Sequence, residues 1–294
     1  MNWLKGLKAR VVANEPLSKH TTLRVGPRAD FWVEPQDREA LRALLKKARL
    51  LGKDYLVIGL GSKLLIKKKK LDLAVHLKGG EFSELRAEGD YISAGAGVRM
   101  PRLLKAAYDN GLGGVEFLNG IPATVGGAIR LNAGVGWPER IEIGAFVESV
   151  EVMDNAGRIK TLDKKGLEFG YRYSNLKPYI ILKAVFGLFK KRKKNIRIKM
   201  RKYRDYRVKT QELGQPSAGC VFKNHNGTSS GRLIDLCGLK GRRIGDAAVS
   251  GKHANFILNM GKASSSDVLD LMALIQKRVK NKFNLELEPE IQLI

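Results

Sequence analysis

One of the chain's two cysteines stands in surroundings that suit chemistry better than packing. In the run QPSAGCVFKN (215–224), Cys220 follows Ser, Ala and Gly and comes just before a Lys-Asn pair. A core cysteine behaves as a small apolar residue and is expected among bulky apolar neighbours. Cys220 is therefore a candidate reactive thiol, whereas Cys237, inside the helical pattern RLIDLCGL, is expected to be buried and inert.

Cysteine and histidine spacing argues against a metal site or a disulfide framework. The two cysteines lie 17 positions apart (237 − 220), and the four histidines show no H-x-E or H-E-x-x-H spacing. We therefore expect no bound metal. Because free thiols persist in a reducing compartment, we expect a cytoplasmic protein.

Two glycine-rich segments are the second chemical feature. GLGS (59–62) follows an apolar strand pattern, as phosphate-binding turns do, because glycine lets backbone N–H groups approach an anion closely. It lacks G-x-G-x-x-G and G-K-[ST], so a plain turn at the end of a strand explains it at least as well. GIPATVGGAIRLNAG (120–134) has little side-chain volume and is expected to lie against a large flat group. A tightly packed crossover between two layers is the alternative.

The formal charge of +25 is concentrated in two blocks, IKKKK (66–70) and residues 188–209. In the second block, charges alternate with Ile, Met and Tyr at a spacing that fits a strand or an amphipathic helix with one wet face. We favour a solvated face over attraction of anionic substrates, and both over specific nucleic-acid binding, because neither block lies beside an aromatic stacking motif.

Neither a membrane span nor a signal peptide is expected. No apolar run approaches the ~20 residues that a transmembrane helix needs. The first twenty residues have no continuous apolar region and no small-residue cleavage site.

A mixed α and β chain must position these residues. Helical periodicity is expected over residues 37–52, 100–114, 229–241 and 264–284, with Asp37 as an N-cap. Strand patterns are expected over residues 21–35, 253–259 and 285–294, the last an edge or bulged strand because it contains Pro289. Residues 54–66 are expected to be a buried strand that runs into the glycine-rich turn.

Seven segments occur in a fixed order and together carry a resemblance. They are TTLRVGPRADFWVEP, VIGLGSKLLI, GVEFLNGIPATVGGAIRLNAGVG, FGYRYSNLK, PSAGCVFKN, GRLIDLCGLKGRRIGDAAVSGKHANFILN and LEPEI. From about residue 14 to the end, the chain closely resembles the UDP-N-acetylenolpyruvoylglucosamine reductase family. One departure is Lys63, which follows Gly-Ser where the family usually has Asn, and another is His225 in place of Pro.

The resemblance implies an α+β fold with three parts. Two subdomains, 1–76 and 77–190, would form an FAD-binding module of the PCMH or vanillyl-alcohol-oxidase type. Residues 191–294 would form an α+β substrate-binding domain. The shift toward basic residues near position 188 agrees with the second boundary.

The implied activity is NADPH-dependent reduction of the enolpyruvyl group of UDP-N-acetylglucosamine enolpyruvate, giving UDP-N-acetylmuramate for peptidoglycan. FAD would be bound noncovalently, and the partners would be this UDP-linked sugar and NADPH, with no specific nucleic acid. Two alternatives stay open. One is a flavin oxidase of the same fold acting on an alcohol or sugar, and the other is a basic nucleic-acid-binding protein.

The resemblance also assigns residues. Arg172 would bind the substrate carboxylate and stabilise an enolate, and Glu290, preferred over Glu288, would act as a protonated acid. Cys220 stands where many members have the serine that protonates C2, and its thiol is expected to project from a turn. FAD would be held by Gly59, Gly61, Ser62, Leu64, Ile121, Pro122, Thr124, Gly126, Gly127 and Asn132. Substrate contacts are expected from Asn224, Lys240 and His253.

Overall fold

The computed structural model describes residues 2–225 and 227–294, and the chain forms two compact units. Unit 1 contains the chain up to Asn14, Asp30–Gly59 and Asp72–Tyr206. Unit 2 contains Glu15–Ala29, Leu60–Leu71 and Arg207–Ile294. The chain therefore passes between the units several times, and the turn that follows Gly59 is one of the crossings.

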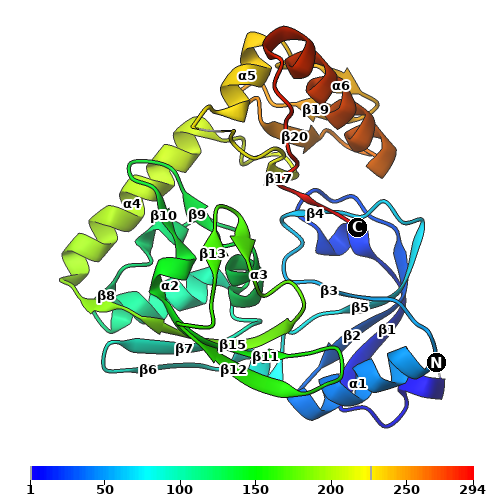
Figure 1. Ribbon diagram of the computed structural model, residues 1–294, viewed down its shortest axis with the longest axis vertical. Helices are drawn as coiled ribbons and strands as arrows, with labels where there is room; N and C mark the ends of the chain where they lie inside the picture. The colour runs from blue at the N-terminus through cyan, green and yellow to red at the C-terminus, as the bar shows by residue number, and fades with distance from the viewer. Residues whose placement is uncertain (1, 226) are drawn as a thin grey trace. The chain divides into compact units, whose positions relative to one another are not determined.

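A four-stranded sheet with the order β1-β2-β5-β3 opens the fold. Its strands are β1 (Ala9–Pro16), β2 (Arg28–Pro35), β5 (Lys70–Val75) and β3 (Tyr55–Val57). Helix α1 (Arg38–Leu50) begins where the Asp37 side chain accepts a hydrogen bond from Ala40 N at 2.8 Å, as expected for an N-cap. Leu41 and Leu44 of α1 belong to one buried cluster with Leu73 of β5, so the apolar stripe of the helix packs on the sheet (Figure 1).

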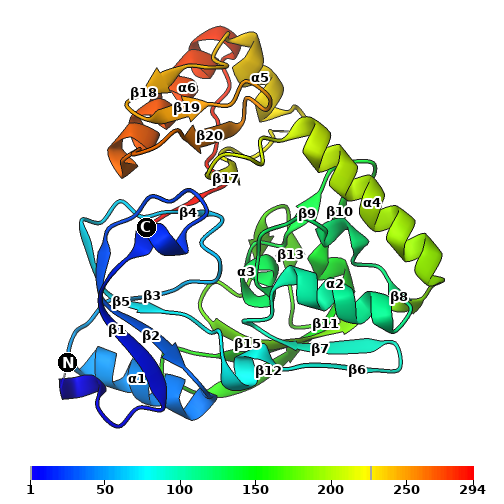
Figure 2. The same cartoon turned by 180° about the vertical axis from the view of Figure 1, so that it is seen from behind.

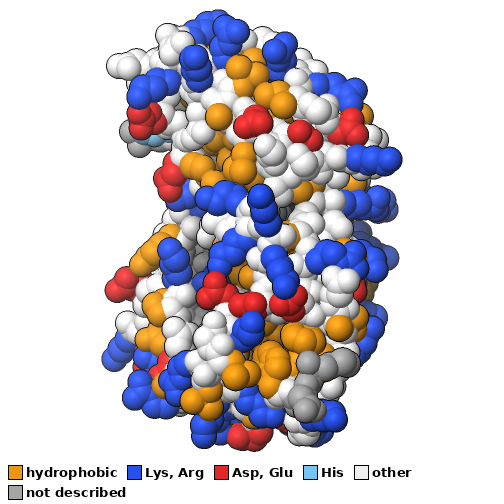
Figure 3. Space-filling view, turned by 90° about the vertical axis from the view of Figure 1, so that its right-hand side faces the viewer, with side chains coloured by type: hydrophobic (Ala, Val, Ile, Leu, Met, Phe, Trp, Pro, Cys, Tyr) orange, Lys and Arg blue, Asp and Glu red, His pale blue; other side chains and the backbone are white. Residues whose placement is uncertain are grey.

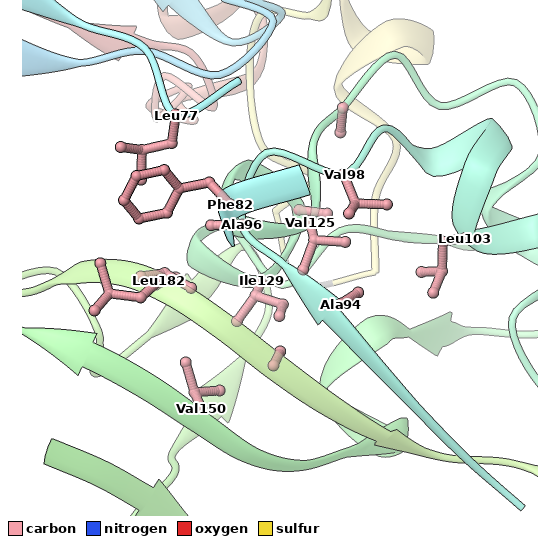
Figure 4. Packing of buried hydrophobic residues seen from close by; sticks show 14 of the residues in the cluster. Leu77, Phe82, Ala94, Ala96, Val98, Leu103, Val125, Ile129, Val150 and Leu182 are labelled. Atoms are coloured by element: carbon pink, nitrogen blue, oxygen red, sulfur yellow. The ribbon is translucent and has the colours of Figure 1, made fainter. Parts of the chain in front are cut away.

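A five-stranded antiparallel sheet forms the centre of unit 1, in the order β12-β11-β15-β7-β6. The strands are β12 (Ile159–Asp163), β11 (Val147–Met153), β15 (Ile180–Gly187), β7 (Tyr91–Gly95) and β6 (Leu85–Glu88). Helices α2 (Met100–Asp109) and α3 (Val125–Arg130) cover one face of this sheet (Figures 1 and 2). Val125 and Ile129 of α3 share a buried cluster with Val150 and Leu182 of the sheet (Figure 4).

Three small strand pairs complete unit 1. They are β8 (Leu112–Gly113) with β16 (Phe189–Lys190), β9 (Gly134–Val135) with β10 (Ile141–Glu142), and β13 (Phe169–Gly170) with β14 (Tyr173–Ser174). The last pair is a hairpin whose loop is Tyr171-Arg172.

The basic block forms a helix, α4 (Lys193–Thr210), so the helical alternative holds. Among its residues only Ile196 and Tyr203 are buried, which gives the wet face that the charge pattern indicated. Lys and Arg side chains are spread over the whole face drawn in Figure 3, with Asp and Glu between them. The exposed basic residues of α4 fit a solvated face.

Unit 2 is built on an antiparallel sheet with the order β17-β20-β19-β18. Its strands are β17 (Ser217–Cys220), β20 (Phe256–Asn259), β19 (Ala247–Val249) and β18 (Arg243–Ile244). Helices α5 (Ser230–Leu236) and α6 (Ser265–Phe283) belong to the same unit (Figure 2) and contribute Ile234, Leu271 and Ile275 to its core. A capping box of Ser264 and Asp267 starts α6.

Four of the sequence expectations need correction. The buried strand expected within 54–66, ahead of the glycine-rich turn, is Tyr55–Val57 and is half-buried rather than buried. The tail is a strand only over Gln292–Leu293 (β21), which pairs in parallel with β4 (Leu64–Leu65), because Pro289 has no N–H to donate to a ladder. Cys237 lies half-buried at the end of α5 rather than inside the core. Cys220 ends a strand instead of projecting from a turn.

No helix within the described residues combines the length and hydrophobicity of a transmembrane segment.

Candidate active site

The two glycine-rich segments meet inside unit 1. A Cβ on Gly59 would lie 2.6 Å from Thr124 Oγ1, so the backbone of the first segment packs against a side chain of the second. Thr124 is the N-cap of α3, and its hydroxyl accepts a hydrogen bond from Gly127 N at 3.3 Å. Any side chain at position 59 would displace this cap, which explains the glycine there.

Residues 120–134 divide into a packed half and an open half. Ala123, Val125 and Ile129 are buried, so this half is the tight crossover that we considered as the alternative. Pro122 and Gly127 are exposed, and around them the chain presents backbone and small side chains at the surface. The open half is the part that fits a large flat ligand.

Two backbone donors in the second glycine-rich segment are used within the protein. Val125 N donates to Val98 O at 2.8 Å, and Gly126 N donates to Ala96 O at 2.9 Å. A Cβ on Gly126 would lie 3.0 Å from Ala96 Cβ. Gly126 therefore serves close packing of α3 on the neighbouring chain, and its contribution to a ligand is shape rather than a hydrogen bond.

Asn132 joins three segments of unit 1. Its Nδ2 donates to Glu142 Oε2 at 2.8 Å and to Gly170 O at 2.9 Å, and its Oδ1 accepts from Gly144 N at 2.9 Å. The residue is buried and has a φ of +43°, a conformation that Asn tolerates better than most residues. Both side-chain donors are engaged within unit 1, so Asn132 joins these three segments.

In unit 2, the turn over residues 61–64 is held close to a neighbouring backbone. Gly61 has a φ of +60°, and a Cβ there would lie 2.2 Å from His20 O. Only glycine fits this conformation and this contact. Ser62 is half-buried in the turn, and Leu64 begins β4.

Arg172 occupies the tip of the β13–β14 hairpin in unit 1. Its φ of +56° is unusual for a residue with a long side chain, and such conformations concentrate at functional sites. Nη2 donates to Gly134 O at 3.3 Å, and the guanidinium carbon lies 5.1 Å from the centroid of the Tyr171 ring. The side chain is half-buried, so it is oriented while remaining accessible.

Cys220 lies at the irregular end of β17 in unit 2. The pairing of β17 with β20 shifts register between Ser217 and Cys220, and Gly219 in that bulge has a φ of +69°. Bulges re-aim side chains and are enriched beside active sites. Burial lowers the pKa of the Arg207 guanidinium while the charge of Cys220 works in the opposite direction, which places this arginine close to the half-buried thiol.

Glu290 lies beside β17 in a buried position. Its backbone N–H donates to Val221 O at 2.7 Å, and only 3% of its side chain is exposed. Lys63 Nζ lies 2.6 Å from Glu290 Oε1 and donates to Cys220 O at 2.7 Å. Lys63 departs from the family pattern, and its ion pair favours a carboxylate at Glu290 over the protonated acid that we expected.

Glu288, the rival of Glu290, faces solvent. Its side chain is 68% exposed and pairs with Lys223, whose Nζ lies 2.5 Å from Oε1. Burial thus separates the two glutamates, and the preference for Glu290 rests on it.

The three expected substrate contacts all belong to unit 2. Asn224 Oδ1 accepts from Ser230 N at 3.1 Å near the start of α5, and Lys240 pairs with Asp235 at 2.6 Å. Burial lowers the pKa of His253, and the charges of Lys240 and Lys63 lower it further. His253 therefore lies near both lysines.

Asn255 is engaged with the backbone of Phe222. Its Oδ1 accepts from Phe222 N at 2.9 Å, and its Nδ2 donates to Phe222 O at 2.8 Å. Across residues 2–225 and 227–294, His, Cys, Asp and Glu nowhere gather in threes as a metal ion would require.

Curated relatives match almost the whole chain, and family models match two parts of it. Residues 29–163 match an FAD binding domain, and residues 211–294 match the C-terminal domain of UDP-N-acetylenolpyruvoylglucosamine reductase. The reductase of that name from Bacillus licheniformis is 37% identical over 97% of this chain and 94% of its own length. The one from Moorella thermoacetica is 40% identical over 98% of this chain and 94% of its own length.

Comparison with solved structures points to the same family as the sequence matches. The UDP-N-acetylenolpyruvylglucosamine reductase (MurB) from Thermus caldophilus aligns with a TM-score of 0.81 at 36% identity, covering 97% of this chain and 98% of that one. The 6-hydroxy-D-nicotine oxidase from Arthrobacter nicotinovorans aligns with a TM-score of 0.52 at 12% identity, over 63% of this chain and 43% of that one, which is a likeness of fold alone. The expected flavin module with an additional C-terminal domain is thereby confirmed, and the chain belongs to the UDP-N-acetylenolpyruvoylglucosamine reductase family.

Proposed function

We infer that this chain reduces the enolpyruvyl group of UDP-N-acetylglucosamine enolpyruvate to UDP-N-acetylmuramate, with NADPH as the reductant, in the synthesis of peptidoglycan precursors. The observation that carries this assignment is identity of 35% to 40% with reductases of one name over nearly the whole chain. Neither alternative is favoured, because the oxidase likeness is one of fold, and on the face drawn in Figure 3 Lys and Arg side chains are interspersed with Asp and Glu.

The open half of residues 120–134 fits FAD. A flat ring system needs a surface with little side-chain volume, and Gly127 and Pro122 provide exposed positions of that kind. When bound, FAD supplies a hydride carrier between NADPH and the enolpyruvyl double bond. We propose that Gly59, Thr124 and Gly126 shape this surface and that Ile121 packs at its edge.

We propose that Cys220 gives the proton to C2 of the substrate. Hydride addition to the enolpyruvyl group leaves an enolate, which becomes product once C2 is protonated. A thiol with an ordinary pKa near ~8.5 carries its proton at pH 7, so it supplies one without a preceding step. The bulge at Gly219 would direct the thiol away from the strand ladder.

We propose that Arg172 binds the carboxylate of the enolpyruvyl group. Its planar fork of donors matches a carboxylate better than a lysine ammonium does, and its charge stabilises the enolate. The hairpin tip and the contact with Gly134 O orient the guanidinium before substrate arrives.

We propose that Glu290 is the active-site carboxylate and that Asn224, Lys240 and His253 contact the nucleotide sugar. The positive charge of Lys240 would attract the diphosphate of the nucleotide sugar. Ser62, Gly61 and Leu64 are proposed to contribute their turn to FAD binding.

We propose three domains, 1–76, 77–190 and 191–294. Each contains one of the three larger sheets in full, which supports these boundaries. We also propose a cytoplasmic location, because a thiol acid has to stay reduced.

A spectroscopic experiment on the purified protein tests the reaction. The protein should be yellow, NADPH should bleach it under anaerobic conditions, and the enolpyruvyl nucleotide should restore the colour in stopped flow. UDP-N-acetylglucosamine, which lacks the enolpyruvyl group, is the matched control and should leave the reduced flavin unchanged. A protein that is reduced by NADPH but returns no hydride to the enolpyruvyl nucleotide would refute the assignment.

A further inference from the structure

Lys63 stands where three separate segments of unit 2 come together. Its Nζ lies 2.6 Å from Glu290 Oε1 and 2.7 Å from Cys220 O, and its own carbonyl accepts from Gln292 N at 2.7 Å. A Cβ on Gly219 would lie 3.3 Å from the same ammonium, so the bulge leaves room for it. The lysine thus ties its own turn to β17 and to the C-terminal tail.

The ion pair between Lys63 and Glu290 is largely shielded from water. Glu290 has 3% of its side chain exposed and Lys63 has 23%, so water screens the pair only weakly. A buried carboxylate without a cation is strongly disfavoured and takes up a proton instead. Lys63 removes that penalty.

We propose that Lys63 is a positioning residue that keeps Glu290 ionised and fixes the strand end carrying Cys220. The proposal rests on the proposed function, because it concerns how the acid and its neighbouring carboxylate are held for proton delivery. Lys63 acts through Glu290 and the backbone of Cys220 and not through the substrate.

Two other titratable side chains, Arg207 and His253, lie near the Lys63–Glu290 pair. Arg207 lies near Cys220, and His253 lies near Lys63 and Lys240. Burial, Lys240 and Lys63 all lower the pKa of His253, so this histidine is neutral at neutral pH and does not replace Lys63 as the cation. Arg207 remains as a charged neighbour in every variant below.

The kinetic test compares Lys63→Met with a matched surface pair. Lys63→Met keeps the length of the side chain and removes its charge. It should slow reoxidation of the reduced enzyme by the enolpyruvyl nucleotide by ~10²-fold, because small displacements of catalytic groups cost about that much. Lys63→Arg should restore much of the rate. Lys223→Met breaks the exposed pair with Glu288 on the same tail and should change the rate less than about twofold.

A second test measures protein stability and does not depend on enzymatic activity. In Lys63→Met, the Glu290 carboxyl stays buried without its cation, so it should hold its proton in the folded state to a higher pH than in the unfolded chain. Stability from such a group is present at low pH and is lost as pH rises. The decrease in the urea midpoint relative to wild type should therefore be small near pH ~5 and large near pH ~9. The pKa of a buried glutamate can rise to about 8–9, within this range.

The double variant Lys63→Met/Glu290→Gln completes the test. It should be more stable than Lys63→Met at high pH and should show no additional kinetic loss beyond Glu290→Gln, since the two residues act as one unit. If Lys63→Met does not fold, recovery of folding in the double variant supports the proposal equally. Wild-type reoxidation in Lys63→Met, or a stability loss independent of pH, would overturn it. Failure of the wild-type enzyme to reduce the nucleotide would instead count against the proposed function.

Discussion

Replacing Cys220 by Ala isolates the chemistry of the thiol. The contacts that Cys220 makes through its backbone, the strand pairing with Phe256 and the hydrogen bond from Lys63 at 2.7 Å, survive a change of side chain. The sulfur is half-buried, so its removal should lower stability by about 1 kcal/mol or less. The variant therefore keeps the geometry of the site and loses only its proton donor.

The expected effect falls on one half of the reaction. Loss of a general acid costs ~10² to ~10⁴ in rate, which equals about 2.7 to 5.4 kcal/mol of barrier at 1.36 kcal/mol per tenfold change. This exceeds the stability cost, so unfolding does not account for it. Flavin reduction by NADPH involves no proton at C2 of the nucleotide and should be nearly unchanged.

Anaerobic stopped flow measures the two halves separately. NADPH is mixed with the oxidised enzyme, and the enolpyruvyl nucleotide is mixed with the reduced enzyme. Cys220→Ser should keep much of the reoxidation rate, because a hydroxyl at the same place can also donate a proton. Cys237→Ala removes the other half-exposed thiol, whose pKa burial raises, and serves as the control with wild-type rates. Equal slowing of both half-reactions in Cys220→Ala would refute the acid role.

Further predictions concern the carboxylate contact of Arg172, the Glu116–Lys191 ion pair, the hydrogen bonds of Asn132 and the binding of the cofactor. Arg172→Lys should slow reoxidation far more than flavin reduction, and wild-type turnover would argue against a bidentate contact. Burial raises the pKa of the Glu116 carboxyl, but hydrogen bonds from Lys191 at 2.7 Å and from the backbone outweigh it, so the pKa is lowered. This pair stabilises the fold above the unfolded pKa of ~4.3 and loses its effect as pH falls, so Lys191→Met should cost about 3 kcal/mol at pH 7 and less in acid. Urea titrations at several pH values measure the stability loss of Lys191→Met at pH 7 and in acid. Asn132→Ala removes three hydrogen bonds at a positive φ and should cost about 2–4 kcal/mol by urea titration, and a loss below 0.5 kcal/mol would contradict its joining role. Flavin should separate from the protein on denaturation, and flavin that stays attached would contradict noncovalent binding.

Sequence alone determined the elements whose signals are local. The periodicity and the Asp37 cap defined α1, and the run that begins at Ser264 defined α6, because both patterns depend on residues three or four positions apart. The order of short motifs was enough to indicate the family, since it needs no knowledge of contacts. The choice between strand and helix for 193–210 was open, because a wet face with few apolar residues fits both periods.

Tertiary structure decided which distant residues meet. Lys63, Cys220 and Glu290 come from three segments, and no spacing in the sequence states that one ammonium contacts both others. Likewise, Gly126 looked like a donor to a ligand until its N–H was seen to bond Ala96 O. Burial and pairing depend on how the chain closes over long separations, and those are properties of the folded packing rather than of neighbouring residues.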